Sequence, residues 1–194
     1  MLFLVIFFAV LFPVEEAGES VKSRVSLNQE SFLVINGSSN INNFSCSYAF
    51  EEYDSDYSFS ASYDGISYYL NSLTINIPVN QFDCGNRFLK KDFLKTLEYQ
   101  RYPNIFMQLQ NLKLGNTPED EKRNSSVHLN IGGVSREQMV NYQLKTIDDK
   151  TFILEGVTKV DITDFELEPV SRFFGMIKVD KNVEIRFLFK FVVE

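Results

Sequence analysis

The sequence predicts an all-β fold of eight or nine mostly antiparallel strands with one inserted helix. From Ser31 onward, apolar residues recur with a period of two, which is typical of strands that bury one face. Turn residues separate these alternating segments at short intervals, as at Asn36-Gly37, Asp64-Gly65 and Gly132-Gly133. Short loops favour antiparallel neighbours, so this many one-sided strands indicates a barrel or a sandwich.

The clearest strand covers 183–193, where apolar residues at every second position alternate with a partly charged face. The other segments with strand patterns are 32–35, 40–50, 57–62, 73–79, 105–114, 127–131, 140–145 and 151–162. Pro78 lacks a backbone N–H, which restricts the end of its strand to a sheet edge or a bulge.

One segment has helical rather than strand periodicity. Apolar residues from Phe88 to Leu97 recur at helical spacing with lysines between them, and Pro103 prevents continuation much beyond Tyr102. We expect a short amphipathic helix here, and a second, weaker helical or irregular turn over 163–169.

Length and composition exclude several classes of function. The chain of 194 residues is long enough for one domain with a real core. A net charge of −7 lacks the basic surface that a nucleic-acid partner requires. One His and two Cys are too few for a four-ligand Cys/His zinc site or for catalysis by several histidines.

The N-terminus carries an unbroken apolar run over 2–12, followed by Pro13 and the small residues Ala17 and Gly18. This run is too short to cross a bilayer but suits the apolar part of a secretory leader. We therefore expect residues 1–18 to be a signal peptide, residues 19–194 to form the domain, and the protein to be exported, to the periplasm or outside the cell. An uncleaved anchor and a misassigned start are the alternatives.

Three motifs occur in a fixed order: VINGSSNINNFSCSY at 34–48, FDCGNRFLKKDFLKTLEYQRYPNIFMQL at 82–109, and a long segment at 152–191 that begins FILEGVTKV. Together they resemble YceI-like proteins, in particular the secreted branch with a cysteine in each of the first two motifs. The middle motif is the most specific, and the resemblance extends from about Phe32 to the C-terminus.

The resemblance implies an extended eight-stranded, lipocalin-like antiparallel barrel that holds a long-chain isoprenoid or similar apolar lipid in the bacterial periplasm. We expect a non-enzymatic protein without a cofactor other than such a lipid; a lipid-directed enzyme that uses carboxylates is a third hypothesis. An eight-stranded barrel can instead be filled by its own side chains. The alternative is then an empty barrel that acts as an interaction or structural module at the cell envelope, with the tyrosine-rich region as its contact face: Tyr48, Tyr53, Tyr57, Tyr63, Tyr68 and Tyr69.

The strand alternation suggests which side chains would face a lipid. We predict that the ligand-binding residues are Phe44, Ile75, Ile77, Leu129, Ile131, Tyr142, Phe152, Leu154, Phe187 and Phe189. Burial contributes roughly 0.8 kcal/mol per methylene, so several isoprene units could be held without a polar anchor. Ordinary core packing is the competing interpretation for each residue.

Two cysteines in an exported chain favour a disulfide, here between Cys46 and Cys84. It would tie the start of the helix to an early strand. Two free thiols in a reducing compartment are the alternative.

The remaining polar residues give little support for catalysis. His128 alternates with Val127 and Leu129 and is expected to face outward without a partner for general-base chemistry. The acidic clusters at 51–56 and 161–168 lack the spacing of a calcium loop, so we expect solvated charge and no metal site. The sequence leaves open whether the chain is a monomer or a homodimer.

Overall fold

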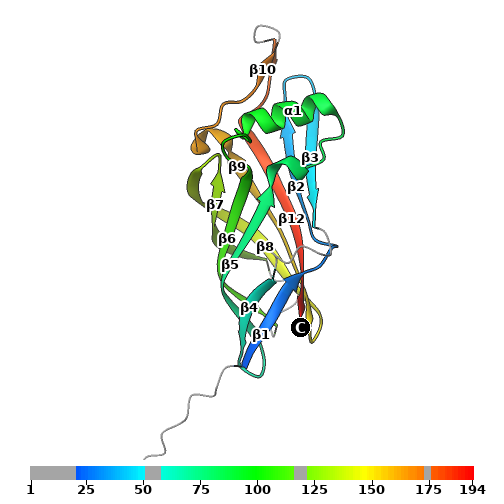
Figure 1. The fold of residues 1–194 in the computed structure, drawn as a ribbon, viewed down its shortest axis with the longest axis vertical. Helices are drawn as coiled ribbons and strands as arrows, with labels where there is room; N and C mark the ends of the chain where they lie inside the picture. Colours follow the sequence, from blue (N-terminus) through cyan, green and yellow to red (C-terminus); the bar gives the residue numbers. More distant parts are fainter. Residues whose placement is uncertain (1–20, 51–57, 116–121, 173–175) are drawn as a thin grey trace, which may run out of the picture.

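The structure is a computed structural model that describes residues 21–50, 58–115, 122–172 and 176–194. It is an elongated β-barrel with one helix near one end (Figure 1). We call the end with α1 and β10 the upper end, and the end where β1 and β4 lie the lower end. The expected leader, residues 1–18, lies outside the described residues, and none of the helices in the described part is long and apolar enough to cross a bilayer.

Ten strands form the main sheet, and all of their pairings are antiparallel. In chain order they are β1 (Val21–Leu27), β2 (Phe32–Ser38), β3 (Asn43–Ala49), β4 (Ser58–Tyr63), β5 (Tyr68–Pro78), β6 (Asn104–Leu114), β7 (Arg123–Ile131), β8 (Val134–Asp148), β9 (Thr151–Asp161) and β12 (Asn182–Val193). A small separate hairpin pairs β10 (Ser171–Arg172) with β11 (Ile177–Lys178).

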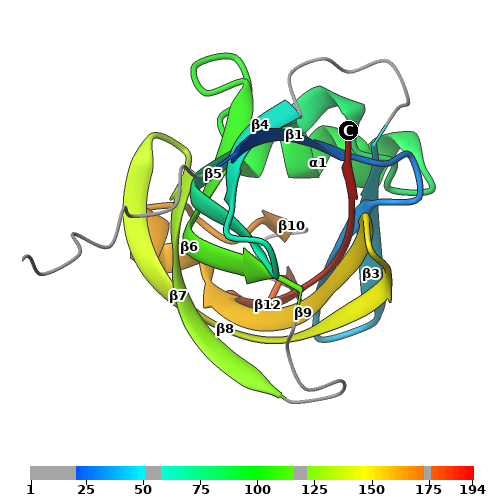
Figure 2. The same ribbon diagram turned by 90° about the horizontal axis from the view of Figure 1, so that it is seen from below.

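The barrel closes differently at its two ends because one edge of β12 has two partners. Near the lower end, residues 191–193 of β12 pair with β1, which pairs onward with β4 and so completes a ring of eight strands (Figure 2). Nearer the upper end, residues 184–188 of β12 pair with β2 instead, and β3 continues the sheet. The upper barrel therefore needs another element to bridge from β3 to β5.

That element is the connection from β5 to α1. A backbone bridge joins Ser47 of β3 to Asp83, with both N···O distances 2.8 Å. Next to it, a disulfide joins Cys46 to Cys84, as the sequence predicted. The ring of Phe82 is fully buried beside Tyr48, with the ring centroids 5.7 Å apart. A covalent bond, two hydrogen bonds and an aromatic contact thus complete the upper wall.

Helix α1 (Arg87–Thr96) lies over this upper end, preceded by the short 3₁₀ turn η2 (Val79–Gln81). The side chain of Asn86 caps it by accepting the N–H groups of Phe88 and Leu89. Phe88 belongs to the helical apolar pattern in the sequence, but its ring is exposed, and the residues that pack against the core begin at Leu89. The helix ends before Glu98, which has a positive φ of 49°.

The lower half of the interior is filled with aromatic rings. Phe189 is fully buried and contacts three other rings, with centroid distances of 5.7 Å to Phe50, 4.7 Å to Phe187 and 6.4 Å to Phe191. Phe152 is buried nearby and meets Tyr68 edge to face at 5.9 Å. This half of the barrel is a packed core.

The predicted all-β barrel with one helix is confirmed, while the count of eight strands is too low. The hairpin β2–β3 adds to the eight-stranded ring, and β10 and β11 are two-residue strands too short to show a period. The expected turn at 163–169 is partly present as the 3₁₀ helix η3 (Ile162–Phe165). Pro78 ends β5, and the segment of β5 leading up to it pairs only with β6 among the described strands, as expected for a sheet edge.

Candidate functional site

A cavity of about 500 Å³ occupies the upper half of the barrel. Strands β2, β3, β5, β6, β7, β8, β9 and β12 supply its walls, and α1 and the segment from η3 onward cover it. Most of the wall residues are aliphatic or aromatic: Leu33, Ile35, Ile77, Ile105, Met107, Val127, Leu129, Ile131, Val140, Val160, Ile185 and Phe187. The cavity volume is within the ~300–1,000 Å³ typical of small-molecule sites.

Phe187 forms the floor of the cavity. Its ring stacks on Phe189 of the packed lower half, with centroids 4.7 Å apart. Directly opposite on β9 is Gly156, where an added Cβ would come within 2.3 Å of the Phe187 Cζ. Glycine at this position therefore makes room for the ring. A small void of about 30 Å³ lies beyond, next to Phe187, Tyr142 and Leu154.

Helix α1 forms part of the roof with the side chains of Leu89 and Phe93, and its C-cap residue Leu97 continues the roof. The Lys90 ammonium holds the helix in place by donating to the backbone carbonyls of Asn80 and Phe82. Cys84 also lines the cavity, so the disulfide is part of its wall.

The deep part of the cavity has little hydrogen-bonding capacity to offer a ligand. Among the lining residues described, Thr158 is the one buried polar side chain. Its hydroxyl donates to the carbonyl of Met139 at 2.7 Å and accepts from the Gln138 amide at 3.1 Å. Because a buried polar ligand group without a partner costs free energy, the deep part of the cavity favours an apolar ligand.

The rim of the cavity carries several polar side chains beside the exposed Ile41. Asn42, Asn43, Asn86 and Asp180 are exposed lining residues. The Asp180 carboxyl accepts hydrogen bonds from the backbone N–H and the side-chain amide of Asn182. These bonds, the backbone one first, lower the pKa of the carboxyl, so it is ionised at neutral pH. An apolar chamber with a polar, charged rim suits an amphiphile whose chain enters first.

The structure divides the ten predicted ligand-binding residues into three groups. Phe44, Ile77, Leu129, Ile131 and Phe187 line the cavity. Tyr142 and Leu154 line the small void below it, while Ile75, Phe152 and Phe189 are buried in the interior outside both spaces. The contact of any of these residues with a ligand stays a prediction.

The sequence reasoning missed several strand residues of the lining, among them Leu33, Ile105 and Met107, and all of the lining outside the ten strands of the main sheet. The part outside these strands includes Leu89 and Phe93 of the helix with its C-cap Leu97, and Ile162, Phe165, Leu167, Val170, Ile177 and Val179 after β9. The helical stripe was visible in the sequence and could have identified the first three. The other six lie in irregular structure or very short elements, where no period marks a buried face.

Other predicted polar features are placed as follows. His128 is exposed on β7, as expected. Asp161 forms an ion pair with Lys181 at 2.7 Å, and the ammonium and the Thr163 hydroxyl lower the pKa of the carboxyl to about 2. Across the described ranges, no three His, Cys, Asp or Glu side chains are grouped to hold a metal ion. The acidic cluster at 51–56 lies outside the described residues.

Four of the six tyrosines in the tyrosine-rich region belong to the described residues, and one of these four is buried. Tyr48 is buried, Tyr63 and Tyr68 stack with centroids 4.6 Å apart, and the Tyr69 hydroxyl donates to Asp64. Tyr53 and Tyr57 lie outside the described residues.

Comparisons with known proteins agree with this architecture. One similar solved structure is a polyisoprenoid binding domain from Saccharophagus degradans implicated in plant cell wall breakdown; the TM-score is 0.63 at 15% identity, over 88% of this chain and 98% of that one. Another is Burkholderia cenocepacia BcnA, with a TM-score of 0.56 at 14% identity, over 83% of this chain and 96% of that one. At these identities the likeness shows a shared fold.

A search among curated proteins finds no match. The family model described as YceI-like domain matches residues 19–191, which is most of the chain. The chain therefore belongs to the YceI-like family.

Proposed function

We propose that this protein is an exported, non-enzymatic lipid-binding barrel that holds the apolar chain of an isoprenoid or similar amphiphile in its upper cavity. The observation that carries the proposal is the chamber of about 500 Å³ whose one buried polar side chain, among the described lining residues, already has its hydrogen bonds. Such a site gains free energy mainly from burying apolar surface, roughly 0.8 kcal/mol per methylene.

The ligand would bind chain first with its head group at the rim. The polar side chains at the rim can hydrogen-bond a head group, whereas Phe187 blocks the way to the lower barrel. The chain therefore has only the upper half of the barrel available, which selects ligands by length. The Saccharophagus degradans domain, described as polyisoprenoid binding, shares this fold and supports the ligand class.

Export is supported by the disulfide and by the apolar run at 2–12. Disulfides persist in oxidising compartments and are rare in the cytosol. A periplasmic or extracellular location follows as part of the proposal.

The competing function is an empty barrel that serves as an interaction or structural module. The packed lower half suits that function, but a module does not need an apolar chamber with a polar rim. A well-formed apolar pocket of this size with a few polar groups is the default candidate for a ligand site.

Solvent extraction of the protein, purified from its native host and analysed by mass spectrometry, tests the proposal. We expect a lipid with a long apolar chain in a molar ratio near one. Extracts that contain no lipid above the level of an unrelated control protein, together with no uptake of polyprenol in vitro, would contradict it.

A further inference from the structure

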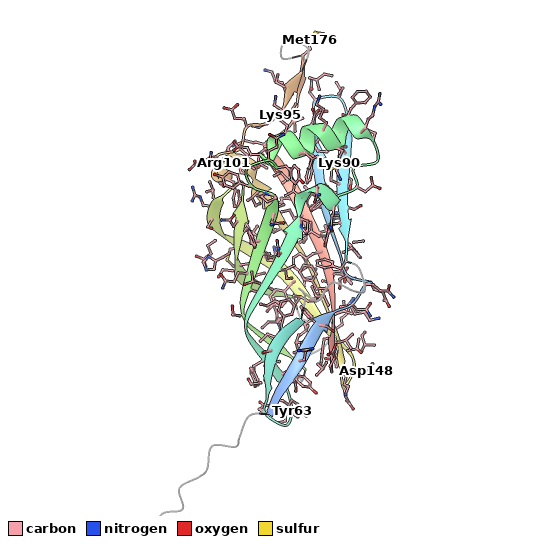
Figure 3. The ribbon with its side chains drawn as sticks, viewed as in Figure 1. Tyr63, Lys90, Lys95, Arg101, Asp148 and Met176 are labelled. Atoms are coloured by element: carbon pink, nitrogen blue, oxygen red, sulfur yellow. A yellow bond between two sulfur atoms is a disulfide. The ribbon has the colours of Figure 1, made fainter. Side chains whose placement is uncertain are left out.

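The upper end of the barrel carries exposed apolar side chains around the mouth of the cavity. Ile41 in the β2–β3 turn, Phe88 in the first turn of α1 and Met176 just before β11 have exposed fractions of 63%, 61% and 75%. Figure 3 shows Met176 at the extreme upper tip. Large apolar side chains presented together on a surface often mark contact with a protein or a membrane.

Hydrogen bonds hold two of these tips beside each other. The Asn40 amide donates to the carbonyl of Met176 at 2.8 Å and accepts the N–H of Lys178 at 2.9 Å. A backbone bridge between Ser39 and Val179 extends this contact. The two hairpins therefore form one unit, and both contribute residues to the lining of the cavity, as does α1 beside Phe88.

The helix at this end is basic although the whole chain has a net charge of −7. Helix α1 contains four basic residues, Arg87, Lys90, Lys91 and Lys95, and one acidic residue, Asp92. Arg87, Lys91 and Lys95 are exposed, and Lys178 adds a further exposed cation on β11. Acidic residues are present on the other side of the mouth, at Asp180 and after η3. The positive charge is thus concentrated along the helix.

The lower end also exposes apolar side chains, but the charges beside them are mixed. Ile66 and Ile147 there are 64% and 56% exposed. Their neighbours within three positions in sequence are three acidic residues, Asp64, Asp148 and Asp149, and two basic residues, Lys145 and Lys150. Only the upper end combines apolar tips, basic side chains and the mouth of an apolar cavity, so far as the described residues show.

From this combination we infer that the upper end docks on a lipid bilayer that contains anionic lipids. The apolar tips would insert among the acyl chains while the basic side chains of α1 contact the anionic head groups. This inference rests on the proposed function, because docking at the mouth would let an apolar chain pass from the bilayer into the cavity without crossing water.

Vesicle flotation with purified, delipidated protein tests the inference. The probes are vesicles of phosphatidylcholine alone and vesicles with roughly one third phosphatidylglycerol. We expect the protein to float with the anionic vesicles and to bind at least tenfold less to the neutral ones, with binding that weakens as salt is raised. A protein that floats with neither vesicle overturns the inference.

Matched variants locate the surface. Ile41→Ser combined with Met176→Ser should lower binding to anionic vesicles at least tenfold, and Lys91→Glu combined with Lys95→Glu should do the same. Ile66→Ser combined with Ile147→Ser removes similarly exposed side chains at the opposite end and should leave binding unchanged. Equal losses in the upper and lower variants would overturn the inference.

Uptake of a polyprenol delivered from detergent, without vesicles, separates the two proposals. Uptake without vesicle binding would refute docking and leave the proposed function intact. Vesicle binding without uptake, by a protein whose native extract also contains no lipid, would refute the proposed function and leave docking intact. Circular dichroism at equal protein concentration shows that each variant is folded.

Discussion

The disulfide closes the wall of the cavity, and this role can be measured. We consider the double variant Cys46→Ala with Cys84→Ala, which removes the bond and leaves small apolar side chains at two buried positions. The bond joins residues 38 apart in sequence. By the loop-entropy relation, a cross-link of this span stabilises the folded state by about 4 kcal/mol.

The same residues complete the upper wall, so the variant should affect the site as well as stability. Without the bond, the Ser47–Asp83 bridge and the buried Phe82 ring would have to hold the β5–α1 connection against β3. Since Cys84 lines the cavity and is two residues before Asn86, the cap of α1, we expect the roof to loosen. Binding of an apolar chain should weaken along with stability.

Urea unfolding followed by circular dichroism is the assay. For a slope of about 2 kcal/mol per molar urea, a loss of about 4 kcal/mol lowers the midpoint by roughly 2 M. Reduction of the wild-type protein should give a similar shift, and adding reductant to the double variant should give none. If both midpoints stay within about 0.3 M of the oxidised wild type, on a slope of that size, the disulfide does not stabilise this wall and the reasoning is wrong.

Two further predictions concern the floor and the ion pair. Phe187→Ala should join the cavity to the small void below it, so that mass spectrometry of extracted lipid shows longer chains than the wild type holds. The lost ring should also cost about 3–5 kcal/mol of unfolding free energy, and unchanged chain lengths in a folded variant would contradict the assignment of the floor. In the folded protein the pKa of Asp161 is about 2, below its ordinary value of 3.8. The ionised carboxylate therefore stabilises the fold above about pH 4, and this stabilisation is lost as the pH falls toward 2. The difference in melting temperature between the wild type and Asp161→Asn should therefore shrink from pH 5 to pH 2, and a constant difference would argue against the Lys181 pairing.

Alternation in the sequence was enough to predict the strand faces but not the empty space between them. On β12 the residues Ile185, Phe187, Phe189 and Phe191 share one face, as predicted. Ile185 nevertheless borders the cavity, while Phe189 lies in solid core. Whether a residue of this face borders the cavity or the core depends on which aromatic rings from distant strands fill the lower barrel. The alternation of apolar residues along one strand carries no information about those partners.

The strand count failed for a related reason. In β1, Ser23 interrupts the apolar pattern, and the strand forms because its edges pair with β4 and with the last residues of β12. These partners are far away in sequence, so local periodicity does not reveal them. The disulfide was easier to predict because the chain has only two cysteines, which leaves one pairing.

The most direct test of the central claim compares two tryptophan substitutions on neighbouring residues of β7. Leu129 is buried and lines the cavity, whereas His128 is exposed on the opposite face of the same strand. Both variants are expressed in the native host, checked for folding, extracted with solvent and assayed by mass spectrometry for bound lipid. Leu129→Trp should place an indole ring in the chamber and lower the bound lipid at least tenfold, while His128→Trp should retain the wild-type amount. A folded Leu129→Trp protein with wild-type lipid content would show that the upper cavity is not the binding site.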